Sequence, residues 1–218
     1  MINSLNILLP EIFLSLSIFT ILMVGVFIKK SFNLIFNLTS LILIFTMAII
    51  FNNPNYEEKI FLDSFIRDSF SNYFKILILI SSLFVLNSSK IFIIENKLDK
   101  FEYPIIILLS ILGMFFMVSA NDLILFYMGL ELQSLSLYIL ATIDRDNLRS
   151  SESGIKYFVL SALSSGLLLY GCSLLYGFTG STNFDLIAAQ LNKENVGAVF
   201  AMVFILVGLA FKISAVPF

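Results

Sequence analysis

The sequence predicts an all-α polytopic membrane protein, and two observations carry this prediction. Hydrophobic residues make up 59% of the 218 residues, whereas a water-soluble domain has about 45–50%. These residues also gather in about seven runs, each near the roughly 20 residues that an α-helix needs to cross the hydrocarbon core. We therefore expect about seven transmembrane helices rather than one water-soluble core.

Short polar connections separate the runs. The predicted transmembrane segments are residues 5–28, 32–51, 73–94, 104–120, 123–143, 155–176 and 196–218. The runs are apolar on every face, which favours helices over a β-barrel with its alternating strands. Asn121 and Asp122 leave so little chain between the fourth and fifth segments that these two helices must be antiparallel neighbours. Pro217 predicts that the last helix is broken near its end.

Composition excludes several kinds of site. The sequence has no histidine, which removes histidine metal sites and haem ligation through histidine. Its single cysteine, Cys172, can form neither an internal disulfide nor an iron–sulfur site on its own, and we expect it to be a small buried apolar side chain. The net charge of −2 does not suggest nucleic-acid binding. Any redox centre connected with this protein must therefore be bound by a partner.

Two ionisable residues of opposite charge lie inside apolar segments. Glu131 follows Asp122 by nine residues, which at about 1.5 Å per residue places its carboxylate roughly 13 Å into the membrane. Lys212 lies within the last apolar run. Because each such charge costs about 2.5–3.5 kcal/mol on insertion scales, these positions indicate function. A buried Glu/Lys pair stabilises both charged forms, so separating the partners changes how strongly each holds its proton. A static ion pair that fixes helix packing is the alternative.

Two further features bear on a proton route. Lys212 lies shortly before Pro217, and broken membrane helices occur where they line a cavity or an ion path; an ordinary kink is the alternative. Lys156, at the start of the sixth segment, is either an interfacial anchor or a proton site between the membrane surface and the buried pair. The serines that follow it either support a hydrated path or allow close helix packing, which we favour; they are Ser161, Ser164 and Ser165.

Other notable residues have ordinary interpretations. The ionisable residues near segment ends are expected to lie at the membrane interface; they are Glu11, Lys75 and Lys90. Three glycines suggest close helix contacts; they are Gly166, Gly171 and Gly177. Four charged residues between the fifth and sixth segments are expected to be solvated; they are Asp144, Arg145, Asp146 and Arg149.

Basic residues in the connections predict the orientation of the chain. One side has Lys29, Lys30, Lys97, Lys100, Arg145 and Arg149, with Lys90 near it, and the other has Lys59, Arg67, Lys75 and Lys193. The positive-inside rule predicts that the first side faces the matrix or cytoplasm. The N-terminus then lies on the opposite side, which is the intermembrane space in a mitochondrion.

Several runs of the sequence resemble a known family. They are residues 8–13, 120–135, 144–158, 164–180 and 208–218, and they include Gly129-Leu130-Glu131-Leu132 and Phe211-Lys212-Ile213-Ser214-Ala215-Val216-Pro217. These runs resemble subunit 2 of mitochondrial NADH:ubiquinone oxidoreductase (complex I) and its bacterial counterpart, chain N. The resemblance is most specific over about residues 104–218.

The resemblance implies an antiporter-like bundle, built in the family from inverted repeats with broken seventh and twelfth helices. Residues 1–103 would form the first three transmembrane helices, and residues 104–218 would form helices four to seven with the buried pair. Glu131 would be the fifth-helix carboxylate, Lys212 the seventh-helix lysine paired with it, and Lys156 a sixth-helix lysine linked to activity. The sequence ends just after the expected break, so we expect the N-terminal half of a subunit that a second polypeptide completes; a fragment is the alternative.

The hypothesis is thus a proton-translocating, antiporter-like subunit of NADH:ubiquinone oxidoreductase. The resemblance implies that other membrane-arm subunits are its partners, that partner subunits bind NADH, FMN, iron–sulfur clusters and ubiquinone, and that this chain binds no cofactor or metal. The bias toward Ile, Leu, Phe, Asn and Lys fits an AT-rich genome, as many organelle genomes are, and the resemblance implies the mitochondrial inner membrane. The alternatives are a subunit of a multi-chain sodium/proton antiporter, a purely structural membrane-arm subunit, and a plastid homologue with another electron donor.

Overall fold

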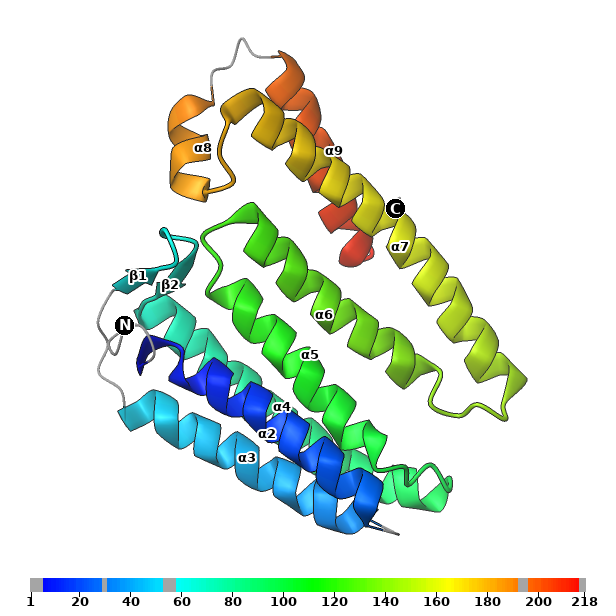
Figure 1. The fold of residues 1–218 in the computed structure, drawn as a ribbon. Helices are drawn as coiled ribbons and strands as arrows, with labels where there is room; N and C mark the ends of the chain where they lie inside the picture. Colours follow the sequence, from blue (N-terminus) through cyan, green and yellow to red (C-terminus); the bar gives the residue numbers. More distant parts are fainter. Residues whose placement is uncertain (1–5, 29–30, 53–57, 192–195, 216–218) are drawn as a thin grey trace.

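The computed structural model describes residues 6–28, 31–52, 58–191 and 196–215. These residues are mostly helical, with one antiparallel two-stranded hairpin (Figure 1). The helices and strands in chain order are α2 (Leu9–Phe27), α3 (Phe32–Asn52), β1 (Glu58–Ile60), β2 (Phe65–Arg67), α4 (Ser69–Glu95), α5 (Glu102–Val118), α6 (Leu123–Ala141), α7 (Leu148–Thr179), α8 (Phe184–Gln190) and α9 (Val196–Lys212).

Five helices of the described residues are long and apolar enough to cross a membrane, namely α2, α3, α4, α6 and α7. The fourth and seventh predicted segments correspond to α5 and α9, which are apolar helices of 17 residues each. At about 1.5 Å per residue, such a helix is about 25 Å long, somewhat short of the roughly 30 Å hydrocarbon core. The predicted class, an all-helical multi-pass membrane protein, is confirmed, while five of the seven expected segments reach spanning length.

Helices α4 and α7 begin earlier than the sequence predicted because polar side chains cap their first turns. The Asp68 carboxylate accepts a hydrogen bond from the Ser71 backbone N–H at 2.7 Å, and the Ser71 hydroxyl accepts one from the Asp68 N–H at 3.0 Å. This capping box starts α4 at Ser69. The Asn147 side chain similarly accepts from the Arg149 N–H and starts α7 at Leu148. Hydropathy did not reveal these turns because their residues are polar.

The helices enclose two apolar cores. In the first core, α2, α3, α4 and α5 each contribute a fully buried leucine, namely Leu14, Leu43, Leu79 and Leu108. The second core joins α6, α7, α8 and α9 through Leu123, Leu168, Cys172, Leu175, Ile187, Ala198 and Ala201. The prediction that Cys172 is a buried apolar residue is confirmed. Figure 1 shows α5 and α6 as the adjacent helices where the two groups meet.

Glycines allow two of the helix contacts. A Cβ on Gly113 of α5 would lie 2.7 Å from the Gln133 nitrogen and 2.8 Å from the Gly129 oxygen of α6, so the antiparallel contact expected of these helices depends on that glycine. A Cβ on Gly171 of α7 would lie 2.8 Å from the Ile205 nitrogen of α9. The expectation of close contacts is therefore right for Gly171. It is wrong for the two glycines named with it, Gly166 and Gly177, where a Cβ would meet no atom within 4 Å.

Three connections interlock at one end of the bundle: the β1–β2 hairpin, the α5–α6 junction and the α7–α8 loop (Figure 1). Asn121 in the α5–α6 junction donates from Nδ2 to the Asp63 carbonyl at 3.0 Å and to Asp185 Oδ2 at 3.2 Å. Lys59 Nζ on β1 donates to the same Asp185 oxygen at 2.8 Å. We call Lys59, Asn121 and Asp185 the outer latch. The sequence predicted the tight junction but neither the hairpin nor α8.

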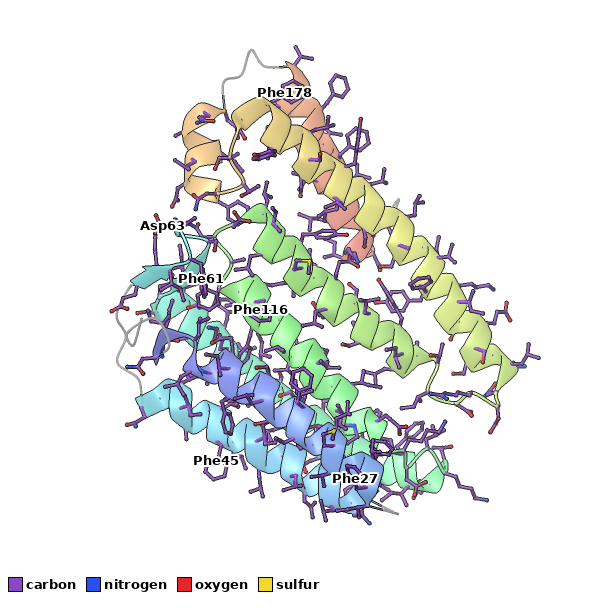
Figure 2. The ribbon with its side chains drawn as sticks, viewed as in Figure 1. Phe27, Phe45, Phe61, Asp63, Phe116 and Phe178 are labelled. Atoms are coloured by element: carbon purple, nitrogen blue, oxygen red, sulfur yellow. The ribbon has the colours of Figure 1, made fainter. Side chains whose placement is uncertain are left out.

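The opposite end of the bundle holds the α4–α5 and α6–α7 connections (Figure 1). There Lys100 Nζ donates to the Ile143 carbonyl at 2.9 Å, which ties the two connections together. The described basic residues of the connections lie on the predicted sides, with Lys97, Lys100 and Arg145 at this end and Lys59 at the other. Lys29, Lys30 and Lys193 lie outside the described residues, and Arg67 and Lys75 are buried, as described below. Along the helices many apolar side chains face outward, including Phe27, Phe45 and Phe178 (Figure 2). Such faces suit contact with lipid or with partner helices.

Candidate functional site: a Glu/Lys pair between three helices

The structure brings Glu131 and Lys212 together. Lys212 Nζ lies 3.1 Å from Glu131 Oε1, and the two side chains are 10% and 22% exposed, respectively. Glu131 is the ninth residue of α6, about 12 Å from the start of the helix at about 1.5 Å per residue. Because an apolar region surrounds both charges, their mutual attraction is screened less than at a water-exposed surface. The pair expected from the sequence therefore exists as an interhelical contact.

Lys212 has an acceptor for each of its three ammonium hydrogens. Besides Glu131, its Nζ donates to Ser134 Oγ at 2.9 Å and to the Tyr138 hydroxyl at 3.5 Å. The acceptors Glu131, Ser134 and Tyr138 occur at positions i, i+3 and i+7 of α6, which lie on one face of a helix. Sequence reasoning missed Ser134 and Tyr138, although this spacing of polar residues in an apolar helix was the signal that could have identified them.

Two serines of α7 complete the polar network. Ser165 donates a hydrogen bond to Glu131 Oε1, and the Tyr138 hydroxyl donates one to Ser161 Oγ. Ser161 and Ser165 are four residues apart, so they share one face of α7. Ser161 and Ser165 therefore contribute hydrogen bonds to the network in addition to lying at the contact between α6 and α7. A continuous set of contacts thus runs from Ser165 through Glu131, Lys212 and Tyr138 to Ser161.

Helix α9 ends at Lys212, five residues before Pro217, near which the sequence predicted a break. The Ser214 N–H donates to the Phe211 carbonyl at 3.1 Å, and the Ala215 N–H donates to the Ala210 carbonyl at 2.9 Å. With Ser214 at φ 53°, these bonds form a Schellman motif, which closes a helix C-terminus. The negative end of the helix dipole favours the lysine cation there. Pro217, to which the break was attributed, lies outside the described residues.

Lys156 is not part of this network. Its Nζ pairs with Glu152 Oε1 at 2.6 Å on the exposed face of α7, where the lysine side chain is 69% exposed. Nine residues separate Lys156 from Ser165, and at about 100° per residue this places them on opposite faces of α7. The exposed position agrees with the interfacial interpretation of Lys156. Its role as an auxiliary proton site stays a prediction.

The structure corrects the interpretation of Glu11 and Lys75 as interfacial residues. Lys75 Nζ lies 2.6 Å from Glu11 Oε1, and the side chains are only 1% and 3% exposed. The reason is the capped start of α4 at Ser69, which places Lys75 in the second turn rather than at the helix end. Lys90, the third residue of this group, is partly buried, with its Nζ 5.0 Å from the centre of the Phe36 ring.

The described residues contain no group of three or more His, Cys, Asp or Glu side chains that could hold a metal ion. The network around Glu131 and Lys212 contains a carboxylate, an ammonium group and hydroxyl groups. Such groups bind, hold and pass protons.

Comparisons with known proteins identify the class of this protein. A family model described as "NADH:quinone oxidoreductase/Mrp antiporter, TM" matches residues 120–218, which include Glu131 and Lys212. The fold is that of respiratory complex I from Thermus thermophilus with bound aureothin, where a chain matches with 26% identity and a TM-score of 0.79 over 96% of this chain and 45% of that one. The Mrp complex from Dietzia shares the fold, with a TM-score of 0.74 at 22% identity over 98% of this chain and 42% of that one. The chain is an antiporter-like membrane protein.

The relatives of this chain are more specific. NADH-quinone oxidoreductase subunit N of Pelagibacter ubique is 56% identical over 217 residues, covering 99% of this chain and 46% of that protein. The same subunit of Bartonella bacilliformis is 51% identical over 220 residues, covering 100% and 45%. The chain is thus a homologue of NADH-quinone oxidoreductase subunit N and corresponds to the N-terminal part of that protein. It spans about half the length of these curated relatives.

Proposed function

We propose that this chain belongs to a proton-translocating subunit of an NADH:quinone oxidoreductase, and that Glu131 and Lys212 couple charge movement to proton movement. The observation that carries the proposal is the 3.1 Å contact between these two side chains at the end of α9. The names of the relatives support the assignment to the oxidoreductase. In our proposal the chain works within the membrane arm, and partner subunits carry NADH, FMN, the iron–sulfur clusters and the quinone.

The strength of the ionic contact makes it suited to this task. At 3.1 Å and an effective dielectric constant of about 20, two unit charges attract by about 5 kcal/mol. If a neighbouring charge draws the ammonium of Lys212 away, Glu131 loses this attraction and binds a proton more readily. The return of Lys212 favours release of that proton. Charge movement in neighbouring parts of the enzyme would thereby drive proton uptake and release at this pair.

The hydroxyl groups offer a route for the proton. The Tyr138 oxygen accepts from Lys212 Nζ and donates its own hydrogen to Ser161. If Lys212 passes a proton to this oxygen, the phenol hydrogen moves to Ser161, and the Ser161 hydroxyl gives its own hydrogen to a water molecule. Both hydroxyl groups then stay neutral. Lys156 lies about 7–8 Å along the α7 axis from Ser161 at about 1.5 Å per residue, and it would serve as an auxiliary site toward that end of the membrane.

Replacing Glu131 by Gln in the intact enzyme tests the proposal. We expect the Glu131→Gln enzyme to assemble and to oxidise NADH with an artificial electron acceptor, while proton pumping in proteoliposomes is lost. Glu95→Gln, at the exposed end of α4, is the matched control and should pump normally. Pumping that survives Glu131→Gln would support the structural alternative, in which the pair only fixes helix packing. Glu131→Asp keeps the carboxylate charge. Pumping that is lost in Glu131→Gln and retained in Glu131→Asp is therefore due to loss of the charge and not to loss of assembly.

The other expectations have direct tests. Purification of the native assembly through a tag on this chain should recover flavin, iron–sulfur clusters and NADH:quinone activity. An assembly without them would favour a subunit of a multi-chain sodium/proton antiporter. This chain shares its fold with a chain of the Mrp complex.

The second polypeptide stays a prediction, which the subunit composition of the same assembly tests. The mitochondrial inner membrane and the side of the N-terminus also stay predictions, since the relatives compared are bacterial; organelle fractionation and protease protection test them.

A further inference from the structure

A second ionic cluster lies away from the proposed site, where α2, β2 and α4 meet. It contains Glu11, Lys75 and Arg67, all at most 5% exposed. Lys75 Nζ donates to Glu11 Oε1 at 2.6 Å, and Arg67 Nη1 lies 3.5 Å from the carbonyl oxygens of Asn6 and Ile7. Ile7 precedes Glu11 by four residues, about one helical turn. The guanidinium therefore lies at the end of α2 that carries the Glu11 carboxylate.

The charges of this cluster do not cancel. One carboxylate faces two cations, so the three buried side chains carry a net charge of +1. The rings of Phe65 and Phe115, centred 5.2 and 5.7 Å from Lys75 Nζ, offset part of the cost of burying that cation. Burial lowers the pKa of Arg67 from its usual value, and the charges of Glu11 and Glu58 act in the opposite direction. Glu11 is thus the buried counter-charge of both cations, and Glu58, opposite Arg67 in the hairpin, acts on Arg67 from a partly exposed position.

The cluster also has unused hydrogen-bonding capacity. Within the described part of the chain, three buried side-chain atoms have no hydrogen-bond partner, namely Glu11 Oε2, Arg67 Nη2 and Ser119 Oγ. Two of these three belong to the cluster, one an acceptor and the other a donor. A buried polar atom without a partner costs about 1–3 kcal/mol. A water molecule that accepts from Nη2 and donates to Oε2 removes both costs, and buried waters typically occupy such positions.

We propose that Glu11, Lys75 and Arg67 form a second ionic site that binds a water molecule between Glu11 Oε2 and Arg67 Nη2. The site positions α2 against the β1–β2 hairpin and the start of α4, and it is separate from the Glu131–Lys212 pair. Arg67 and Lys75 remain buried as cations because Glu11 serves both of them. Its loss would leave two buried like charges, whereas loss of Lys75 would leave a balanced Glu11–Arg67 pair.

This difference between the partners provides the test. In the intact enzyme we expect Glu11→Gln to reduce the amount of assembled subunit several-fold and to lower its unfolding temperature. Lys75→Met should have a smaller effect, and the double variant should recover part of the loss caused by Glu11→Gln. Glu11→Asp, which keeps the negative charge, should assemble without the loss caused by Glu11→Gln. Equal losses from Glu11→Gln and Lys75→Met would overturn the shared role of Glu11, because they would indicate a simple two-residue pair.

Two further measurements address the water and the separation from the proton route. Cryo-electron microscopy of the native enzyme, at a resolution that shows other internal waters, should show a water within hydrogen-bonding distance of both atoms. The absence of density there, or a protein atom in its place, would overturn the water site. Enzyme assembled with Lys75→Met should pump the same number of protons per NADH as the native enzyme. A lower number of protons per NADH would overturn the proposal that the second ionic site only positions the helices. This measurement does not depend on the outcome for Glu131→Gln.

Discussion

Glu131 and Lys212 are 81 residues apart in the chain and meet where helix α9 ends, with Lys212 Nζ 3.1 Å from the carboxylate. Because Lys212 is the last residue of α9, its position depends on the Schellman turn that follows as well as on the helix itself. Glu131, in contrast, is held near the middle of α6. A change in the turn would therefore act on the lysine more directly than on the carboxylate, which is what the proposed separation of the pair requires.

The Tyr138 hydroxyl contacts both Lys212 and Ser161, so its removal should affect proton transfer more than folding. We expect Tyr138→Phe to leave the enzyme assembled, to cost about 1–3 kcal/mol for the groups left without a partner, and to slow proton pumping several-fold. Pumping in proteoliposomes and thermal unfolding measure the two effects. Tyr176→Phe, at a half-exposed tyrosine of the same helix as Ser161, is the control. Unchanged pumping in Tyr138→Phe would exclude this hydroxyl from the route.

The contact between α5 and α6 should not tolerate a side chain at Gly113. A methyl group there would lie within 2.8 Å of backbone atoms of Gln133 and Gly129, and overpacking of this kind costs about 1–3 kcal/mol. We expect Gly113→Ala to lower the unfolding temperature of the subunit and to shift α6, which carries Glu131. Gly166→Ala meets no atom within 4 Å and should be neutral or stabilising by up to about 1 kcal/mol. Similar unfolding temperatures for the two variants would contradict the close contact.

As the proposed auxiliary proton site, Lys156 should affect proton pumping without affecting stability. Its ion pair with Glu152 is an exposed i,i+4 contact, worth about 0.3–0.5 kcal/mol. We expect Lys156→Met to leave thermal stability unchanged and to reduce the pumping rate less than Glu131→Gln does. Glu152→Gln removes the same ion pair but keeps the lysine charge, so it should pump normally. Equal pumping by Lys156→Met and the native enzyme would leave Lys156 as an interfacial anchor.

The outer latch should contribute to stability equally across the neutral pH range. The hydrogen bond from Lys59, with a further one from Asn121, lowers the pKa of Asp185 below 3.8, and the bond to Asp185 raises the pKa of Lys59 above 10.5. The contribution of Asp185 is present above its unfolded pKa and is lost as the pH falls through the lowered value. The contribution of Lys59 is present below its unfolded pKa and is lost as the pH rises through the raised value.

Asp185→Asn should therefore lower the unfolding temperature by the same small amount at about pH 6 and about pH 9. The effect is small because the ion pair is exposed. Thermal unfolding of the purified enzyme at the two pH values measures it. Asp146→Asn is the matched control, because Asp146 lies in the exposed α6–α7 connection and outside the latch. If the decrease in unfolding temperature differed between the two pH values for Asp185→Asn and not for the control, the assignment of the latch to this ion pair would be contradicted.

Long apolar runs and isolated charges within them could be predicted because both are local properties of the sequence. A run of about 20 apolar residues is a transmembrane candidate regardless of its neighbours, and a charge within it is costly wherever the helix packs. The family resemblance supplied the pairing of Glu131 with Lys212. The starts of α4 and α7 were missed because hydropathy does not register the polar caps Asp68 and Asn147.

Only the tertiary structure decided which polar side chains meet. Ser165 joins the carboxylate of Glu131 while Lys156 of the same helix points away, because the packing of α7 against α6 and α9 selects one face of the helix. Glu11 and Lys75 are 64 residues apart and both lie near helix starts, where a charge can reach water unless neighbouring elements cover it. The hairpin, α5 and the capped turn of α4 provide that cover, and no local pattern of residues specifies such an arrangement.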